Sequence, residues 1–272
     1  MSAPARLRID LAYDGAPFVG FARQRDQVTV QGRLEEACER LLGQPVSSVC
    51  AGRTDRGVHA LAQVCHLDVD AEVARASRAV ADLDGFARRL DRVVGDAITI
   101  WAVRRVPARF DARFSATARQ YRYRLVDAAR MDPLLRHDHV LVGGPLALRE
   151  MQAGATLLIG EHDFASFCRK AAGGTTVRRV TEATVRRVGP HRIDVRVVGT
   201  AFCHQQVRSM VGCLLEVGRG TRPPEWIAEV LAARDRSAAA RVAPAHGLVL
   251  ERVSYGRAWP AAPPRHAPPS GA

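Results

Sequence analysis

Residues 51–60, with the sequence AGRTDRGVHA, present a single carboxylate between basic side chains. Asp55 has Arg53 two positions before it and Arg56 directly after it, and two glycines bracket these polar residues. Glycine permits backbone conformations that other residues avoid, so the stretch predicts a turn that holds the acid. Nearby guanidinium groups favour the ionised carboxylate, which can serve as a nucleophile, a base or an electrostatic anchor.

A second interpretation of Asp55 involves no chemistry. An aspartate in a glycine-flanked turn often accepts hydrogen bonds from its own backbone, and an adjacent arginine often forms only a solvated ion pair. The short motif alone therefore leaves a catalytic and a structural role open, and the rest of the chain has to decide between them.

The composition is that of a globular protein with a high positive charge. The chain has 272 residues, enough for two modest domains or one large α/β domain, and 47% of them are hydrophobic. Its formal net charge at pH 7 is +12. Because basic side chains that neutralise phosphates release counterions, this excess predicts a polyanionic partner.

Membrane proteins and metalloproteins are disfavoured by the sequence. No apolar run has the length of a bilayer crossing, and the first residues contain no apolar signal core, so we expect a cytoplasmic protein without membrane attachment. His137 and His139 form a potential ligand pair with no third partner, which predicts no metal site.

The cysteines are expected to be small, buried apolar side chains. They lie far apart and form no Cys-x-x-Cys pair, so neither a zinc ribbon nor a disulfide framework is predicted. They are Cys38, Cys50, Cys65, Cys168, Cys203 and Cys213.

Regular elements are expected on both sides of the Asp55 loop. Apolar residues alternate over residues 7–13, which predicts a half-buried strand. Helical spacing follows Thr29, a potential N-cap, up to Leu42, and a second alternating pattern covers residues 65–69. A loop held between such elements suits catalysis on a rigid scaffold.

The remaining pattern mixes helices with strands. Residues 71–94 have a helical composition, and residues 177–188 and 192–198 are predicted to be paired strands that turn at Gly189 and Pro190. These segments favour an α+β fold.

Aromatic and basic residues gather in the middle of the chain. Residues 107–114 interleave phenylalanine with arginine, and Tyr121 and Tyr123 share one face of a predicted strand. Arginine with aromatic residues can bind a nucleic-acid backbone and stack on bases. The alternative is that the phenylalanines and tyrosines only pack in the core.

Arg208 lies near the start of a helix predicted within residues 202–218, at the edge of its apolar face. A positive charge at that end of a helix opposes the helix dipole, so a half-buried arginine there is expected to have an acidic partner.

Two stretches of the chain are similar to each other. Residues 8–18 align with residues 192–202, and an amphipathic helix is predicted soon after each. If the similarity reflects a repeat, the protein has two related α+β halves with a cleft between them, where a loop of one half can meet an arginine of the other.

Six separated motifs together resemble the bacterial tRNA pseudouridine synthase A family over about residues 7–255. They are YDGAPFVGFARQ with TVQGRLEEA, AGRTDRGVHA, FDARFSA with RQYRYRL, GEHDFASF, FCHQQVRSMVGCLLEVGRG and APAHGLVLERVSY. One of them alone is weak, whereas six in the order of the family make the resemblance specific.

The resemblance implies a fold of two α+β halves with ferredoxin-like topology. They form a continuous, mainly antiparallel sheet with the active site in a central cleft. The halves are expected at residues 1–108, with the catalytic aspartate loop, and 109–258, with Tyr121 and Arg208. Residues 259–272 are rich in proline and alanine, which predicts a disordered tail.

The resemblance also implies a reaction and its residues. The catalytic aspartate of the family corresponds to Asp55, the arginine that pairs with it to Arg208, the stacking tyrosine to Tyr121, and the arginine that holds the flipped-out nucleotide to Arg53. The family isomerises uridine to pseudouridine in the anticodon stem-loop of tRNA, with no cofactor or metal, and a homodimer grips one tRNA. Flipping the base out of its stack costs a few kcal/mol.

The chain departs from the family pattern in two places. Asp91–Gly95 lacks the usual turn sequence but is expected to keep its helix, and Gln206 stands where the family has methionine. A competing hypothesis is an RNA-binding module or chaperone without chemistry, which the charge and the aromatic residues would equally support. Such a binder has no need for Asp55 or Tyr121. A zinc-dependent base deaminase is disfavoured because its His-x-Glu and Pro-Cys-x-x-Cys signature is missing.

Overall fold

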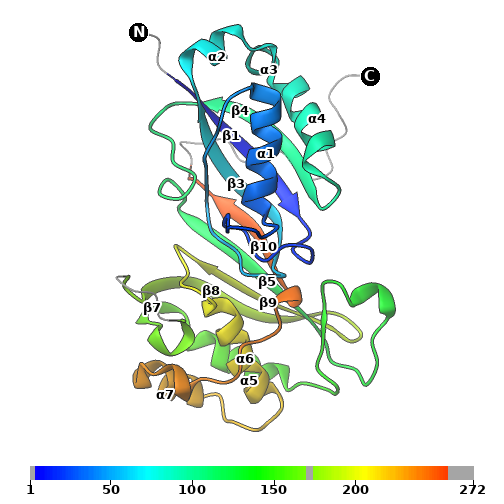
Figure 1. The fold of residues 1–272 in the computed structure, drawn as a ribbon. Helices are drawn as coiled ribbons and strands as arrows, with labels where there is room; N and C mark the ends of the chain where they lie inside the picture. Colours follow the sequence, from blue (N-terminus) through cyan, green and yellow to red (C-terminus); the bar gives the residue numbers. More distant parts are fainter. Residues whose placement is uncertain (1–3, 170–173, 257–272) are drawn as a thin grey trace. The chain divides into compact units, whose positions relative to one another are not determined.

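The computed structural model describes residues 4–169 and 174–256 (Figure 1). The chain divides into two compact units. The first contains the chain up to Thr117 and the described residues from Glu251 onward, and the second is Ala118–Leu250. The predicted halves meet at a single boundary, between residues 108 and 109. In the structure the described residues from Glu251 onward belong to the first unit, so the chain enters that unit twice. The predicted disordered tail, 259–272, lies outside the described residues.

The first unit has antiparallel strands in the order β4-β1-β3, and β2 pairs with β3 on the side away from β1. Ile9 lies opposite Cys65 on one side and Val103 on the other. The strands are β1 (Ala5–Tyr13), β2 (Ser48–Cys50), β3 (His59–Val69) and β4 (Ile98–Val106). The alternating patterns of the sequence therefore predicted β1 and the end of β3 correctly.

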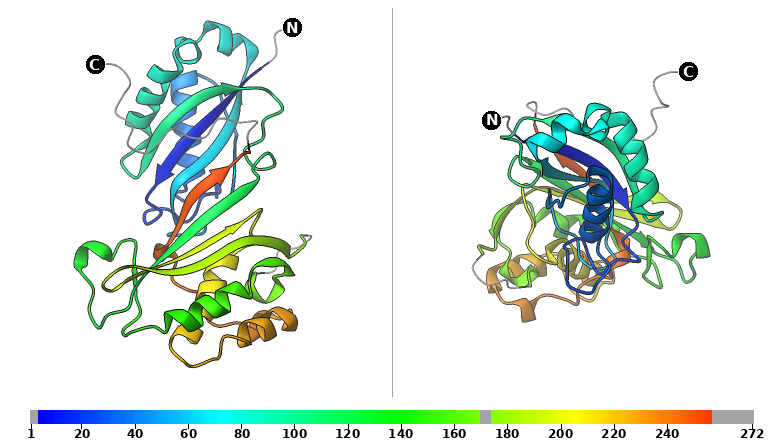
Figure 2. Two further views of the ribbon diagram at one scale, coloured as in Figure 1. Left: turned by 180° about the vertical axis from the view of Figure 1, so that it is seen from behind. Right: turned by 45° about the horizontal axis from the view of Figure 1, so that its top comes forward.

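Four helices accompany these strands, and α1 lies on one face of them, in front of the sheet in Figure 1 and behind it in the reverse view of Figure 2. Thr29 caps α1, because its hydroxyl accepts a hydrogen bond from the Gly32 N–H, and Gly43 ends the helix with φ 72°. The helices are α1 (Val30–Leu42), α2 (Ala71–Ala76), α3 (Arg78–Ala81) and α4 (Leu83–Val94).

The helical composition of residues 71–94 is realised as three helices instead of one. The Ser77 side chain accepts a hydrogen bond from the Ala79 N–H, and the Asp82 side chain accepts one from the Gly85 N–H. Each of these polar side chains starts a new helix and interrupts the one before it. The last helix continues to Val94, so the first departure from the family pattern keeps its helix as expected.

The strand predicted to be half-buried, β1, is buried on both faces. Arg8 and Asp10 point away from the apolar face, but their side chains are each only 2% exposed and form an ion pair of 2.6 Å. The Arg8 guanidinium also lies over the rings of Phe110 and Tyr255, at 5.8 and 5.0 Å from their centroids. The aromatic segment after β4 thus covers this face, and its Phe110 is a core residue.

The second unit has the strand order β5-β9-β8-β7, all antiparallel, with the short β6 parallel to β5. The predicted strand pair with its turn at Gly189 and Pro190 is confirmed as β8 and β9. The strands are β5 (Ala118–Val126), β6 (Val140–Leu141), β7 (Gly160–Asp163), β8 (Val177–Gly189) and β9 (Arg192–Gly199). The strand β10 (Leu248–Ser254) contains residues of both units.

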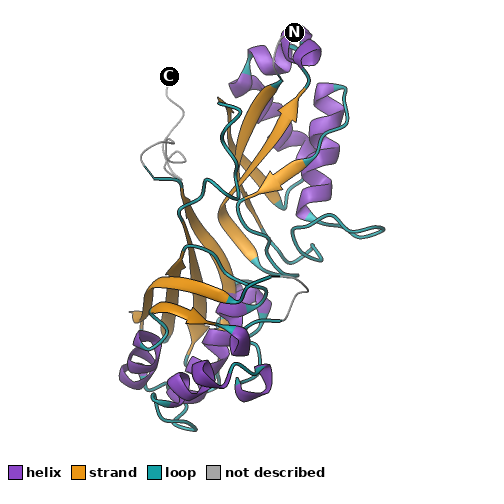
Figure 3. Ribbon diagram, turned by 90° about the vertical axis from the view of Figure 1, so that its left-hand side faces the viewer, coloured by secondary structure: helices purple, strands orange, loops and turns teal. Residues whose placement is uncertain are grey.

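Helices of the second unit lie on one face of its strands (Figure 3). They are α5 (Leu148–Thr156), α6 (Gln206–Gly218) and α7 (Trp226–Ala233), with 3₁₀ turns at Pro133–Leu135, Ala165–Phe167, Arg236–Ala238 and Ala245–Gly247. The helix α6 is the most buried of them. The two similar stretches of the sequence cover most of β1 and all of β9, and α1 and α6 follow them. The α+β class with mainly antiparallel strands is therefore confirmed.

Candidate active site

The Asp55 loop connects β2 to β3 in the first unit. Its turn is closed by a hydrogen bond of 3.1 Å from the Val58 N–H to the Asp55 carbonyl. Gly57, the third residue of this turn, has φ 75°, a conformation that favours glycine. Asp55 is half-buried, and Arg53 and Arg56 are exposed. The loop therefore has the glycine-dependent turn that the sequence predicted, and it presents its acid close to two exposed cations.

Residues 14–21, which follow β1, hold this loop by main-chain contacts. The Phe21 N–H donates to the Thr54 carbonyl at 3.0 Å, and Gly20 forms an isolated antiparallel bridge with Asp55. Gly15 lies so close that a β-carbon on it would be 2.1 Å from the Val58 carbonyl oxygen. The residues that follow β1 thus fix the backbone on both sides of Asp55.

Arg53 and Asp55 share this loop, whereas Tyr121 and Arg208 belong to the second unit. Tyr121 lies on β5 opposite Val197 and is 7% exposed. Its ring meets the Phe202 ring edge to face, with centroids 5.3 Å apart. Sequence reasoning did not single out Phe202, although its place just before a buried helix was a usable signal.

Arg208 lies in the first turn of α6 and is half-buried. Its Nε donates to the Ala243 carbonyl at 2.9 Å, and its own carbonyl accepts from the Ala243 N–H at 3.1 Å. These two bonds fix both the backbone and the near edge of the guanidinium. The acidic partner expected for Arg208 remains a prediction.

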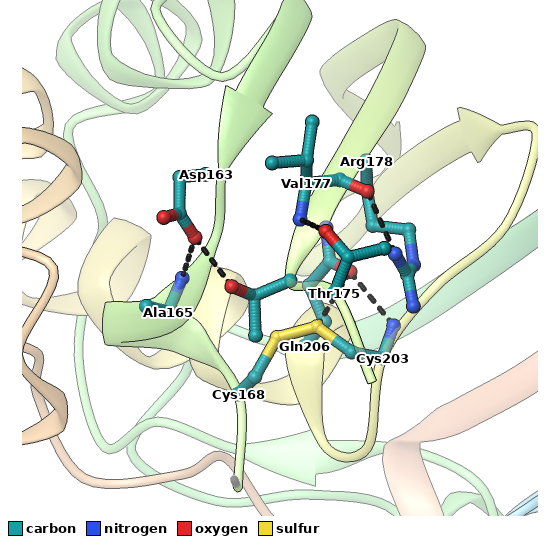
Figure 4. Close-up of a disulfide and its surroundings, with 9 residues drawn as sticks. Asp163, Ala165, Cys168, Thr175, Val177, Arg178, Cys203 and Gln206 are labelled. Carbon is teal, nitrogen blue, oxygen red and sulfur yellow. Dashed lines mark hydrogen bonds between the residues drawn. A yellow bond between two sulfur atoms is a disulfide. The ribbon is translucent and has the colours of Figure 1, made fainter. Parts of the chain in front are cut away.

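Gln206, the second departure from the family pattern, organises the turn before α6. It is 1% exposed, and its side-chain oxygen accepts a hydrogen bond of 2.9 Å from the Cys203 N–H (Figure 4). The Gln206 N–H in turn donates to the Cys203 carbonyl at 3.1 Å. These two bonds close a turn directly before α6, so the glutamine fixes the segment that leads into the helix carrying Arg208.

The expectation of six reduced cysteines is wrong for two of them. Cys168 and Cys203 form a disulfide, with their Cα atoms 5.8 Å apart (Figure 4). The strands β8 and β9 lie between them in the sequence, so their spacing along the chain gave no sign of the pair. The disulfide ties the turn after β7 to the segment that precedes α6.

The other four cysteines are buried and free, as predicted. Burial raises the pKa of the Cys50 and Cys213 thiols to about 11 and that of the Cys38 thiol to about 12. These thiols therefore stay protonated and unreactive at neutral pH.

Reduction of the disulfide is expected to lower the free energy of unfolding by about 4 kcal/mol, because the bond closes a loop across a sequence separation of 35 residues. Chemical denaturation with and without dithiothreitol measures this change. The double variant with Cys168→Ser and Cys203→Ser is the control, since reductant should not affect its stability. Six titratable thiols in the denatured, unreduced protein would contradict the disulfide.

Within the described residues, no three His, Cys, Asp or Glu side chains lie together as a metal site. His139 instead contacts the Asp138 carboxylate at 2.6 Å, and Arg124 pairs with the same carboxylate. None of the helices in this part of the chain has both the length and the apolar character of a membrane crossing.

Comparisons with known proteins agree on one family. Residues 155–256 match the family model described as tRNA pseudouridine synthase. The chain is 47% identical over 252 residues to tRNA pseudouridine synthase A of Frankia casuarinae, covering 92% of this chain and 89% of that protein. The proteins of the same name from Cutibacterium acnes and Aeromonas hydrophila are 43% and 42% identical, each over 92% of this chain and 88% and 90% of theirs.

A solved structure, the archaeal box H/ACA sRNP Nop10–Cbf5 complex, is similar over 77% of this chain and 44% of that chain. The sequence identity is 13% and the TM-score is 0.35, a value at which a shared fold is not established.

Proposed function

The chain belongs to the tRNA pseudouridine synthase A family and isomerises uridine in tRNA, and we propose that Asp55 is the carboxylate that reacts with the substrate. In this isomerisation the bond between C1′ and N1 of uridine breaks and a bond between C5 and C1′ forms. C5 loses a proton and N1 gains one, so the atoms balance and no electrons enter or leave. A nucleophile that holds one fragment while the base turns is the protein's contribution.

The observation that carries this proposal is the construction of the Asp55 loop. Its backbone is fixed by the bridge to Gly20 and by the turn at Gly57, while Asp55 as a residue is only half-buried. A reacting group needs both properties, because it has to be held in place and also has to touch substrate. A purely structural acid would need only the first.

Arg53 and Tyr121 are proposed to hold the uridine once it has left the base stack. Arg53 is exposed beside the acid and carries a charge suited to a phosphate. The edge-to-face contact of Tyr121 with Phe202 supports a fixed ring orientation, which stacking on a flipped base requires.

Arg208 is proposed to pair with the Asp55 carboxylate. Arg208→Ala is expected to lower kcat roughly 100-fold and to change the KM for tRNA much less, because the lost charge acts on the chemistry. Steady-state kinetics with tRNA measure both constants. Arg219→Ala, at the exposed end of the same helix, is the matched control and should change neither.

Weak tRNA binding by Arg208→Ala, with normal turnover once tRNA is saturating, would instead make Arg208 an RNA-binding residue. In that case the proposed pairing with Asp55 is wrong.

The proposal extends to the substrate and the assembly. We propose that the uridines lie in the anticodon stem-loop, that two ferredoxin-like halves share a continuous sheet with the site in a central cleft, and that the enzyme is a cytoplasmic homodimer. The net charge of +12 supports a large polyanionic substrate. Light scattering of the protein with and without tRNA tests the dimer.

Chemical mapping of pseudouridine in an unmodified tRNA transcript incubated with the protein alone tests the function. We expect pseudouridine in the anticodon arm and in no other arm. Salt-sensitive tRNA binding with no product would favour the alternative of an RNA-binding module without chemistry.

A further inference from the structure

A buried network of neutral polar side chains lies beneath the Asp55 loop. The Tyr13 hydroxyl and the Thr54 Oγ1 are 2.8 Å apart, and Gln63 Nε2 lies 3.4 Å from the same Tyr13 hydroxyl. Gln63 Nε2 also donates to the Gly52 carbonyl at 2.7 Å. Tyr13, Thr54 and Gln63 are 4%, 7% and 0% exposed, so the groups of this network are shielded from water.

The Gln63 side chain has a defined orientation in this network. The Gln63 side-chain oxygen accepts from the Val64 N–H at 3.2 Å, which places the amide nitrogen toward Gly52 and Tyr13. The Tyr13 oxygen accepts from this amide, and the Tyr13 and Thr54 hydroxyls share a hydrogen bond in which either can be the donor. Tyr13 and Gln63 therefore hold two residues of the loop from below.

These contacts reach the loop at residues that precede Asp55 in the sequence. Thr54 directly precedes Asp55, and its carbonyl is held separately by the Phe21 N–H. The Thr54 side chain is thus anchored to Tyr13 of β1, and its main chain is anchored to Phe21 in the segment after β1. A rotation of Thr54 would displace Asp55, since the two share a peptide unit.

We propose that Tyr13 and Gln63 are positioning residues for the isomerisation. Through Thr54 and Gly52 they fix the backbone before Asp55 and so set where its carboxylate meets the uridine. This inference rests on the proposed role of Asp55. Burying polar side chains costs free energy because they lose their contacts with water. When their hydrogen bonds are formed within the protein, the network makes the surrounding backbone more rigid.

Tyr13→Phe tests the inference with the smallest possible change. We expect kcat at saturating tRNA to fall about 10-fold to 100-fold, because small displacements of a reacting group have effects of this size, while the KM for tRNA stays within about twofold. Tyr255→Phe is the matched control. Its buried hydroxyl, in the same unit, donates to the Ala112 carbonyl at 2.7 Å, and its loss should leave kcat unchanged.

A double-mutant cycle with Thr54→Val separates positioning from general destabilisation. Two residues that act through one hydrogen bond are expected to be non-additive, so the double variant should lose little more kcat than Tyr13→Phe alone. Equal kcat in Tyr13→Phe and Tyr255→Phe, or fully additive losses in the cycle, would overturn the inference.

Amide hydrogen exchange gives a second readout that does not depend on activity. Exchange at Thr54, Asp55 and Val58 should be faster in Tyr13→Phe than in Tyr255→Phe, and unchanged exchange there also overturns the inference. A wild-type protein that makes no pseudouridine instead overturns the proposed function, whatever the exchange experiment gives. The two failures are therefore distinguishable.

Discussion

Asp55→Ala is expected to lower pseudouridine formation by at least about 10⁴-fold, because removal of a nucleophile eliminates the reaction path and does not merely slow it. Binding of tRNA should change little, since the exposed cations of the loop remain. Single-turnover assays with excess enzyme measure the chemical step, and filter binding measures affinity.

Asp55→Asn refines this experiment by keeping the size and shape of the side chain. It should be as inactive as the alanine variant, because an amide is neither a nucleophile nor a base at neutral pH. Asp26→Asn serves as the control, as Asp26 is an exposed aspartate of the same unit. An Asp55→Asn variant that retains more than about one tenth of the rate would assign Asp55 to binding and leave the nucleophile elsewhere.

Gly15→Ala is expected to destabilise the protein by at least about 3 kcal/mol and to abolish most activity in the fraction that folds. The added β-carbon would lie 2.1 Å from the Val58 carbonyl oxygen and 2.5 Å from its carbon. Both are main-chain atoms, so no side-chain rotation relieves the overlap, and either the loop or the segment after β1 has to move. Urea denaturation gives the change in stability.

Gly144→Ala is the matched control for this experiment. A β-carbon at Gly144 meets no atom within 4 Å, and its backbone has no positive φ, so the substitution should be neutral. Equal stabilities of the Gly15 and Gly144 variants would show that the close approach in the first unit has no energetic consequence.

Local sequence patterns predicted the strands and the capped helix well. The alternation along β1, the N-cap at Thr29 and the turn at Gly189 all appear as expected, because each depends on residues close together in the chain. The burial of Arg8 was not predictable in this way. It depends on Phe110 and Tyr255, which come from distant parts of the sequence and cover the face that the alternation assigns to solvent.

For the site, the motifs indicated which residues matter but not what holds them. Asp55 was singled out from its own neighbours in the sequence, whereas Gln63 appears there as one polar residue of a strand. Its role became visible only when the strand register placed it beneath Gly52 and beside Tyr13. The disulfide was missed for the same reason, since a hairpin of two long strands brings Cys168 and Cys203 together.

The close approach of Gly15 to Val58 has a consequence for engineering chimeras. At Gly15 and Val58 the segment 13–21 and the loop 51–59 touch backbone against backbone, so no side-chain rotation can adjust their fit at this point. A hybrid that takes only one of these segments from a distant relative would therefore combine two backbone segments whose shapes do not fit each other. Transfer of the loop to another protein should succeed only when both segments are exchanged together. The unit that can be transferred therefore consists of two peptides that are separate in the sequence.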